Sequence, residues 1–262
     1  MKISRQDKAI EKEFWDEEAL KEKYLHYEKG VYCAFRESEY DTIFKKAGVK
    51  ILPGMVAVDI GCAGGVSTCL LAENGGRVFG FDISPLLIEK ATEYAKTAKG
   101  HPSFLVADAE KLPLEDSSCD LCFLSGVLHH FPDNSQILKE ITRVLKPEGR
   151  LLAVEPNLLN LSYRASFWLS RRRGETSPNE YPISPLKLKG KLEKEFYNFE
   201  ITPFRVNDVP VLRQLGLNKV KWFYNILQKT IIGMNKTFTS PVRHGTFFIL
   251  SCRKRGQSDS VS

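Results

Sequence analysis

The sequence contains no long hydrophobic run. No apolar stretch reaches the ~18 residues that a membrane-spanning helix needs, and the hydrophobic fraction of 42% is ordinary for a soluble globular protein. The opening stretch from Met1 to Lys8 is polar and charged and leads into more charged sequence, so it does not resemble a signal peptide with its apolar centre. We therefore expect a cytoplasmic protein without a transmembrane segment.

Cysteine is sparse, with six residues scattered along the chain. Most lie in apolar surroundings, which is typical of reduced thiols. Cys119 and Cys122 match the spacing C-x-x-C, which could be half of a zinc site or a redox pair, but no second such motif accompanies them. They begin a strand-like run, and residues three apart on a strand point to opposite faces. We predict no metal site and two buried thiols that diverge.

The excess of positive charge is small. The chain has 38 lysines and arginines against 32 acidic residues, a formal net charge of +6. This charge suits an anionic ligand or surface but falls short of that of a dedicated nucleic-acid binder. A nucleic-acid partner is therefore not expected. The length of 262 residues fits one α/β domain with elaborations.

The central part of the chain, residues 51–157, alternates short apolar runs with amphipathic stretches. Helices are expected at 66–74, after the cap-and-proline pair Ser84-Pro85, and from Asp133 or Asn134 to Leu145. Strands separated by helices of this length form right-handed βαβ units, and hence a parallel sheet covered on both faces. The five strands are predicted at 56–58, 78–81, 104–106, 121–124 and 151–154.

The flanking regions are less regular. Residues 1–50 are predicted to form a helical cap. Residues 158–252 are predicted to supply a lid and the last strands of the sheet, and 253–262 a polar tail. The fold class expected is therefore α/β, Rossmann-like and doubly wound, with a mostly parallel seven-stranded sheet.

Within the region 158–252 the expected elements follow one another. They are a loop at 158–183, a helix at 184–196, a strand at 197–202, a mainly helical stretch at 207–232 and a strand at 246–252. Before this region, a tight turn is expected at 146–149. An alternative for residues 207–232 is a helix at 207–215 followed by a strand at 219–224.

A glycine-rich turn joins the first predicted strand to its helix, with glycines at 61, 64 and 65. Such a turn lets a ligand approach the backbone closely. Asp82 closes the second predicted strand, where a carboxylate can accept hydrogen bonds from both hydroxyls of an adenosine ribose. Enzymes that bind nicotinamide dinucleotides use the same arrangement, so these residues alone leave two cofactor classes open.

Two details favour S-adenosylmethionine (SAM) over a dinucleotide. The dinucleotide pattern G-x-G-x-x-G fails here because Ala63 and Val66 stand at two of its glycine positions. Asp59 precedes the first glycine by two places, and its carboxylate would be unfavourable beside a pyrophosphate. SAM carries a sulfonium and an ammonium group and no phosphate, so the acidic residue suits it better.

At this point a resemblance to a known family is clear. Residues 54–157 resemble the type 11 class I methyltransferase domain, the group that includes the ubiquinone and menaquinone methyltransferases. The resembling stretches are 58–65 (VDIGCAGG), 80–84 (GFDIS), 108–113 (DAEKLP), 127–133 (VLHHFPD) and 145–151 (LKPEGRL). One departure is Ala63, where the family usually has glycine.

The resemblance implies how the cofactor is bound. Gly61 would lie against the methionine part of SAM and Asp82 would bind the ribose. Asp108 would bind the adenine amino group with Ala109 beside the ring, and Ser125 would lie near the sulfonium. The full set of candidate cofactor-binding residues is Asp59, Gly61, Cys62, Ala63, Gly65, Asp82, Ile83, Asp108, Ala109 and Ser125.

Two further groups are candidates on the acceptor side. His129 and His130 follow the fourth predicted strand, and a neutral imidazole there could take a proton from a substrate hydroxyl; in the family, the histidine at the place of His130 is often structural. The arginine run of Arg171, Arg172 and Arg173 could hold an anionic group of the substrate, or it could be a solvated charge run.

The sequence thus predicts a SAM-dependent methyltransferase with a small-molecule acceptor, which could be linked to a lipid or a glycan. We expect the acceptor between the N-terminal helices and segments 158–183 and 203–243. The alternatives are a SAM-binding module that regulates or scaffolds a partner, and a nicotinamide oxidoreductase. The basic, aromatic stretch 207–232 also permits peripheral membrane contact. The sequence predicts neither the methylated atom nor the oligomeric state.

Overall fold

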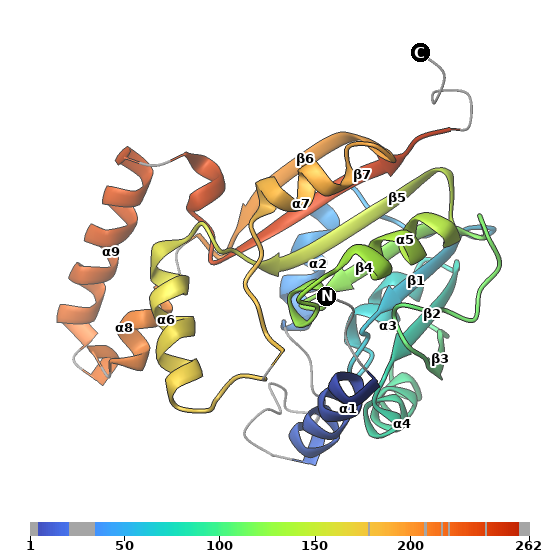
Figure 1. Ribbon diagram of the computed structural model, residues 1–262, viewed down its shortest axis with the longest axis horizontal. Helices are drawn as coiled ribbons and strands as arrows, with labels where there is room; N and C mark the ends of the chain where they lie inside the picture. The colour runs from blue at the N-terminus through green and yellow to red at the C-terminus, as the bar shows by residue number, and fades with distance from the viewer. Residues whose placement is uncertain are drawn as a thin grey trace.

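A computed structural model of the protein describes residues 5–20, 35–177, 179–206, 209–215, 217–219, 221–238 and 240–256. Its centre is one seven-stranded sheet in the order β3-β2-β1-β4-β5-β7-β6 (Figure 1). β1 to β5 pair in parallel, whereas β7 is antiparallel to both β5 and β6. The strands are β1 (Val56–Ile60), β2 (Arg77–Asp82), β3 (Ser103–Val106), β4 (Cys119–Ser125), β5 (Leu145–Pro156), β6 (Phe196–Phe204) and β7 (Phe247–Lys254).

In the described part of the chain, two helices precede the first strand, and the others lie between strands. They are α1 (Arg5–Leu20), α2 (Glu37–Lys46), α3 (Val66–Ala72), α4 (Pro85–Ala95), α5 (Ser135–Val144), α6 (Leu161–Arg172), α7 (Pro185–Leu192), α8 (Pro210–Gln214) and α9 (Lys221–Phe238). Short 3₁₀ turns are η2 (Leu128–His130), η3 (Leu217–Lys219) and η4 (Pro241–Arg243). The predicted α/β, Rossmann-like class is confirmed.

The sheet buries a separate core on each face because side chains alternate along its strands. On β1, Val58 belongs to the core that α5 and α7 cover, whereas its neighbour Ala57 belongs to the core shared with α2 and α3. Figure 1 shows α5 and α7 on the near side of the sheet. Strands buried on both faces and connected through helices are the usual form of a parallel sheet.

The two serine-proline signals mark helix starts, as predicted. Ser84 caps α4 by accepting a hydrogen bond from the backbone N–H of Leu87, and Ser184 caps α7 in the same way with Lys187. In each helix proline occupies the first turn, where no backbone donor is needed. The Ser84 cap fixes the start of α4 directly after the end of β2, next to Asp82.

The structure differs from three expectations about local structure. The segment 158–183, expected as a loop, contains α6, whose N-cap Asn160 accepts a hydrogen bond from the N–H of Tyr163. The turn expected at 146–149 lies within the long strand β5 as an irregularity, in which Glu148 has φ +64° and the residues paired with β4 pass from Leu145 to Arg150. The predicted tail at 253 begins too early, because β7 continues to Lys254 through its pairing with β6. The alternative strand at 219–224 is also absent, because α9 begins at Lys221.

The two C-x-x-C thiols do not diverge as predicted. Cys119 and Cys122 are both buried in the core that α5 and α7 cover. Their neighbours on the strand, Leu121 and Phe123, belong to the core on the opposite face of the sheet. The pairing of β4 with β5 is irregular between Cys119 and Leu121, and such a bulge breaks the alternation of side chains. Both thiols are free. Burial raises the pKa of each, and so does a neighbouring group, which is Asp120 for Cys119 and the thiol of Cys119 for Cys122.

Candidate functional site

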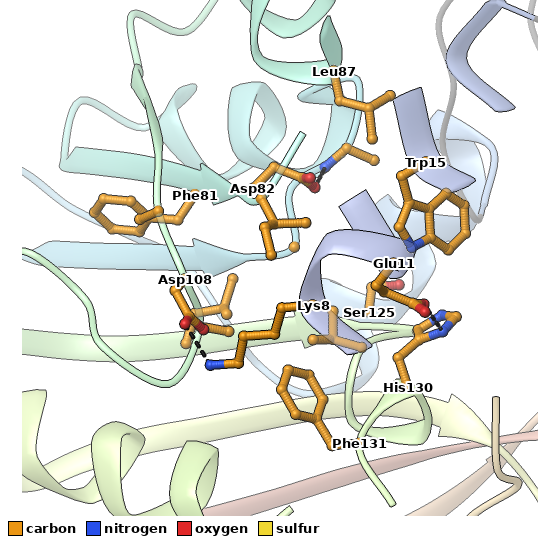
Figure 2. Close-up of a pocket in the computed structure, with 18 of the residues that line it drawn as sticks. Lys8, Glu11, Trp15, Phe81, Asp82, Leu87, Asp108, Ser125, His130 and Phe131 are labelled. Atoms are coloured by element: carbon orange, nitrogen blue, oxygen red, sulfur yellow. Dashed lines mark hydrogen bonds and ion pairs between the residues drawn. The ribbon is translucent and has the colours of Figure 1, made fainter. Parts of the chain in front are cut away.

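A cavity opens where the parallel strands end. Together with the open solvent at its mouth, it encloses about 980 Å³. Gly61 follows β1, Asp82 ends β2, Asp108 follows β3 and Ser125 ends β4, and all four line the cavity. In open α/β sheets this carboxyl edge is where ligands bind. We call these four residues, with Ala63, Ile83 and Ala109, the core wall (Figure 2).

The glycine turn at the core wall is tightly constrained. Gly61 has φ +71°, and a Cβ atom there would lie 2.4 Å from Cγ2 of Val127. Gly65 has φ +81°, and its Cβ would lie within 3 Å of Phe104 and Ala91. Side chains are therefore excluded at both positions by backbone conformation and by space. The turn is held to β2, because the N–H groups of residues 61 and 62 both donate to the carbonyl of Phe81.

Ala63 has the left-handed conformation that favours glycine, with φ +46°. Its N–H donates to Oδ2 of Asp82 at 3.0 Å, while the N–H of Ser84 donates to Oδ1 of the same carboxylate, also at 3.0 Å. These two bonds fix the carboxylate of Asp82 between the glycine turn and the start of α4. The turn therefore keeps its shape with alanine in place of the family's glycine.

Two acidic residues of this region are buried. Burial raises the pKa of Asp82 to about 6, although the backbone N–H groups of Ser84 and Ala63 oppose that shift. Burial also raises the pKa of Asp59 to about 6 against the hydroxyl groups of Ser67 and Thr68, which donate to its Oδ2 at 2.6 and 2.7 Å. Asp59 is therefore behind the turn, where it anchors the start of α3, and it does not line the cavity.

The second wall of the cavity comes from α1. Lys8, Glu11 and Trp15 recur at helical spacing and line the cavity opposite the core wall (Figure 2). We call these three residues the α1 wall. The ammonium group of Lys8 forms ion pairs with Asp108 and Glu110. The helix also packs against α4, where Asp16 accepts a hydrogen bond from Ser84.

Glu11 reaches His130 across the cavity. Its Oε1 lies 2.8 Å from Nδ1 of His130, and the ring of Trp15 meets that imidazole edge-on with centroids 5.3 Å apart. Burial alone would raise the pKa of Glu11, but contacts with His130, Ser177 and Asn179 outweigh it and lower the pKa. The result is a carboxylate that stays ionised beside an imidazole facing the cavity.

The neighbouring His129 has a different environment. Its Nδ1 lies 2.7 Å from Oε2 of Glu155, whose Oε1 accepts the backbone N–H groups of Val127 and Leu128. Burial would lower the pKa of His129, but the hydrogen bond and charge of fully buried Glu155 raise it. His129 does not line the cavity, so it holds the loop after β4 in place while His130 faces the ligand space.

The remaining predicted residues are distributed as follows. Ala63, Ile83 and Ala109 line the cavity with the four strand-end residues, while Cys62 and Gly65 are behind it. The arginine run ends α6 and does not line the cavity. Arg171 donates to the carbonyl of Glu180, and Arg172 stacks on Trp168. Of the described residues in the acceptor-side segments, Asn179 lines the cavity and none from 203–243 does.

Sequence reasoning placed the N-terminal helices beside the acceptor but did not single out the residues of the α1 wall. These residues belong to a charged amphipathic helix with no motif, and nothing local indicates which side faces the sheet. Tyr40, Phe131 and Asn179 also line the cavity and were not singled out. The spacing of Lys8, Glu11 and Trp15 on one helical face was the available signal, but such a face more often packs on a core.

The residues at the core wall fit SAM. The buried hydroxyl of Ser125 faces the cavity and has no hydrogen-bond partner among the described residues. Gly61 leaves a space that a side chain would fill, and apolar side chains of Ile83, Leu87 and Ala109 offer a surface for a purine. The carboxylates of Asp82 and Asp108 suit hydroxyl and amino donors and would repel a phosphate.

Comparisons with known proteins agree with this geometry. Residues 58–153 match the family model described as a methyltransferase domain. These residues are a methyltransferase domain. The fold is that of SAM-dependent methyltransferases, since the chain superimposes on one from Thermotoga maritima with a TM-score of 0.59 at 20% identity, covering 84% of this chain and 90% of that one. SAM, the cofactor expected from the sequence, is the cofactor of proteins with this domain and fold.

Two curated relatives have quinone or hydroquinone substrates in their names. The chain is 37% identical over 123 residues to demethylmenaquinone methyltransferase of Lactococcus lactis, covering 45% of this chain and 49% of that protein. It is 34% identical over 159 residues to 2-methyl-6-phytyl-1,4-hydroquinone methyltransferase of Synechocystis, covering 55% and 49%. The aligned part is thus about half the length of either relative.

Proposed function

We propose that the protein is a SAM-dependent methyltransferase whose acceptor is a small molecule of the quinone or hydroquinone type, bound between the core wall and the α1 wall. The observation that carries the proposal is that the cofactor-fitting residues and a carboxylate–imidazole pair line one cavity. Trp15, Tyr40 and Phe131 give that cavity an aromatic lining. The names of the two relatives support a flat, ring-shaped acceptor.

When bound, the cofactor supplies a methyl group already activated by the positive sulfur. The core wall would orient that group: Asp82 would accept hydrogen bonds from the ribose hydroxyls, Asp108 and Ala109 would hold the adenine, and Gly61 would permit close contact with the backbone. Methyl transfer depends mainly on alignment, because holding the two reactants in line contributes up to roughly 7–11 kcal/mol. Aromatic side chains of the cavity would fix the ring of the acceptor.

His130 is the proposed general base. Its Nδ1 faces Glu11, so Nε2 is the ring nitrogen left to take the proton that an acceptor hydroxyl or ring carbon loses on methylation. The ionised Glu11 stabilises the imidazolium that forms. His129 is not the proposed base, because Glu155 occupies its Nδ1 and its side chain does not line the cavity.

The test is incubation with SAM labelled in its methyl group and with separate pools of quinols, phenols, amines and lipid extracts. We expect labelled product from the quinol pool and at least about tenfold less from Asp82→Asn at the same subsaturating SAM concentration. Binding of SAM without turnover on any pool would instead favour the SAM-binding regulatory module. Thermal stabilisation by a nicotinamide dinucleotide but not by SAM would contradict the proposal and favour an oxidoreductase.

A further inference from the structure

Helix α6 exposes an apolar stripe to solvent. Leu161 is 65% exposed and Trp168 is 52% exposed, and their seven-residue spacing places them on one side of the helix. Arg172, one turn further along, lies on the same side with its guanidinium 3.8 Å above the centroid of the Trp168 ring. The stripe thus combines large apolar side chains with a cation.

Helix α9 has a stripe of the same composition. Trp222 is 68% exposed and Ile226 is 58% exposed, and Lys229 is exposed at the next helical position on that side. The two helices belong to one lobe, because α6 packs on α8, α8 packs on η3 and η3 packs on α9. Figure 1 shows this lobe beyond the end of the sheet. Two of the three tryptophans of the chain are therefore exposed on the same lobe.

The helices of this lobe carry charge of one sign. Helix α6 contains arginines and no acidic residue, and the sequences of α8, η3 and α9 contain no aspartate or glutamate. The acidic residue Glu175 lies in the loop after α6, where it accepts a hydrogen bond from Ser170. Exposed apolar side chains of this size mark an interaction surface, and the charge requires an anionic partner.

We propose that the stripes of α6 and α9 dock the protein on the surface of an anionic lipid bilayer. Tryptophan and long aliphatic side chains insert at the boundary between headgroups and acyl chains, while arginine and lysine bind the phosphates. A nucleic acid would satisfy the charge but not the exposed Leu161 and Ile226. Within the described residues no helix is long and apolar enough to cross a bilayer, so the contact is with the surface.

The test is co-sedimentation with vesicles of phosphatidylcholine and with vesicles that contain phosphatidylcholine and phosphatidylglycerol in equal parts. The wild-type protein binds the mixed vesicles, and added sodium chloride weakens that binding because it screens the lipid charge. The emission of the exposed tryptophans shifts to shorter wavelength in the bound state. Methyl transfer is not measured, so the outcome is independent of the proposed function.

Variants localise the contact. Arg172→Gln and Lys229→Gln each weaken binding about fivefold, whereas Lys46→Gln, an exposed lysine of α2, changes it by less than twofold. Trp168→Ser and Trp222→Ser weaken it several-fold each. Leu161→Ala weakens it more than Leu52→Ala, a matched leucine that is 51% exposed but distant in sequence from the lobe. Circular dichroism and the melting temperature verify that each variant is folded.

Three outcomes would overturn the proposal. Equal binding to both kinds of vesicle would show that the protein does not require anionic lipid. Absence of binding to either kind would show that the stripes do not bind a membrane. A concentration-dependent dimer that Trp168→Ser and Trp222→Ser dissociate, without vesicle binding, would assign the stripes to contact between two copies of the chain. Analytical ultracentrifugation of the same variants distinguishes that case.

Discussion

The core wall and the α1 wall enclose one cavity but are held by different means. At the core wall the glycine turn and Asp82 are fixed by backbone hydrogen bonds between neighbouring strands and loops. The α1 wall is held to the rest of the cavity through side chains, chiefly the ion pairs of Lys8, one of them with Asp108 of the core wall, and the contact of Glu11 with His130. Ion pairs with partly exposed side chains are weak and screened by salt.

This difference assigns separate tasks to the two walls. A rigid wall suits a cofactor that has the same shape in every turnover. A wall held by side-chain contacts can separate from it, as ligand-binding elements commonly do because they belong to the least stable part of a fold. We therefore expect changes in the core wall to affect cofactor binding and changes in the α1 wall to affect the acceptor step.

The largest expected effect is that of His130→Gln. If His130 takes the acceptor proton, kcat falls by about 100-fold or more, while SAM affinity changes little. Glu11→Gln lowers kcat less, because the imidazolium loses its carboxylate. Turnover measured together with isothermal titration of SAM separates an effect on kcat from an effect on SAM affinity. A fall in SAM affinity equal to the fall in kcat would contradict the assignment of tasks.

The matched control is His129→Gln, whose neighbour Glu155 is fully buried. Removing the partner of a buried charge costs about 3–5 kcal/mol, so we expect a loss of stability rather than of kcat. Because the folded-state pKa of His129 is raised, its contribution to stability is complete below the unfolded pKa of 6.5. That contribution is lost as the pH rises through the folded value. Thermal melts at several pH values measure it.

Asp82→Asn is expected to have the next largest effect. Loss of a charged acceptor for two hydroxyls costs about 1.5–3 kcal/mol, so SAM affinity falls about 10- to 100-fold. Since the pKa of Asp82 is raised to about 6, protonation weakens SAM binding in the wild type as the pH falls through that value. Titrations between neutral and acidic pH measure this dependence, which should be smaller in the variant. Equal dependence in both would assign it to Asp59 instead.

Lys8→Met has a smaller effect and the opposite sign. Lys8 pairs with Asp108, the residue expected to bind the adenine, so its removal frees that carboxylate. We expect SAM affinity to rise by up to about fivefold at low salt, with the difference vanishing at high salt. Lys12→Met, on the same helix but paired with Asp16, is the control. Weaker SAM binding by Lys8→Met would make α1 part of the cofactor site and remove the distinction between the walls.

Ala63→Gly is the smallest change. Glycine relieves a left-handed backbone conformation that costs alanine about 1–2 kcal/mol, but it also gains freedom in the unfolded chain, worth about 0.5–1 kcal/mol. The free energy of unfolding should therefore rise by about 1.5 kcal/mol at most, with SAM affinity nearly unchanged. Chemical denaturation measures it. A large loss of stability would mean that the turn depends on the methyl group.

The core wall could be read from the sequence because its geometry is local. The Gly61 turn, the Ser84 cap and Asp82 each lie at a junction of strand and loop or helix, where short-range sterics and hydrogen bonds require particular residues. Helix α6 was missed because a single cap at Asn160 was its main start signal and because its polarity is inverted: Ser162 and Ser166 are buried, whereas Leu161 and Trp168 are exposed. The bulge at Cys119 was missed because it depends on pairing with β5, which no local pattern records.

By itself the sequence determined the α/β class, the carboxyl edge of the sheet and the residues there that suit SAM, since alternating strands and helices of this length form right-handed βαβ units in a parallel sheet. Tertiary structure decided which histidine faces the ligand. His129 and His130 are adjacent and chemically identical, but Glu155 lies opposite the first and Glu11 opposite the second. Those carboxylates come from β5 and α1, so the distinction arises from long-range packing.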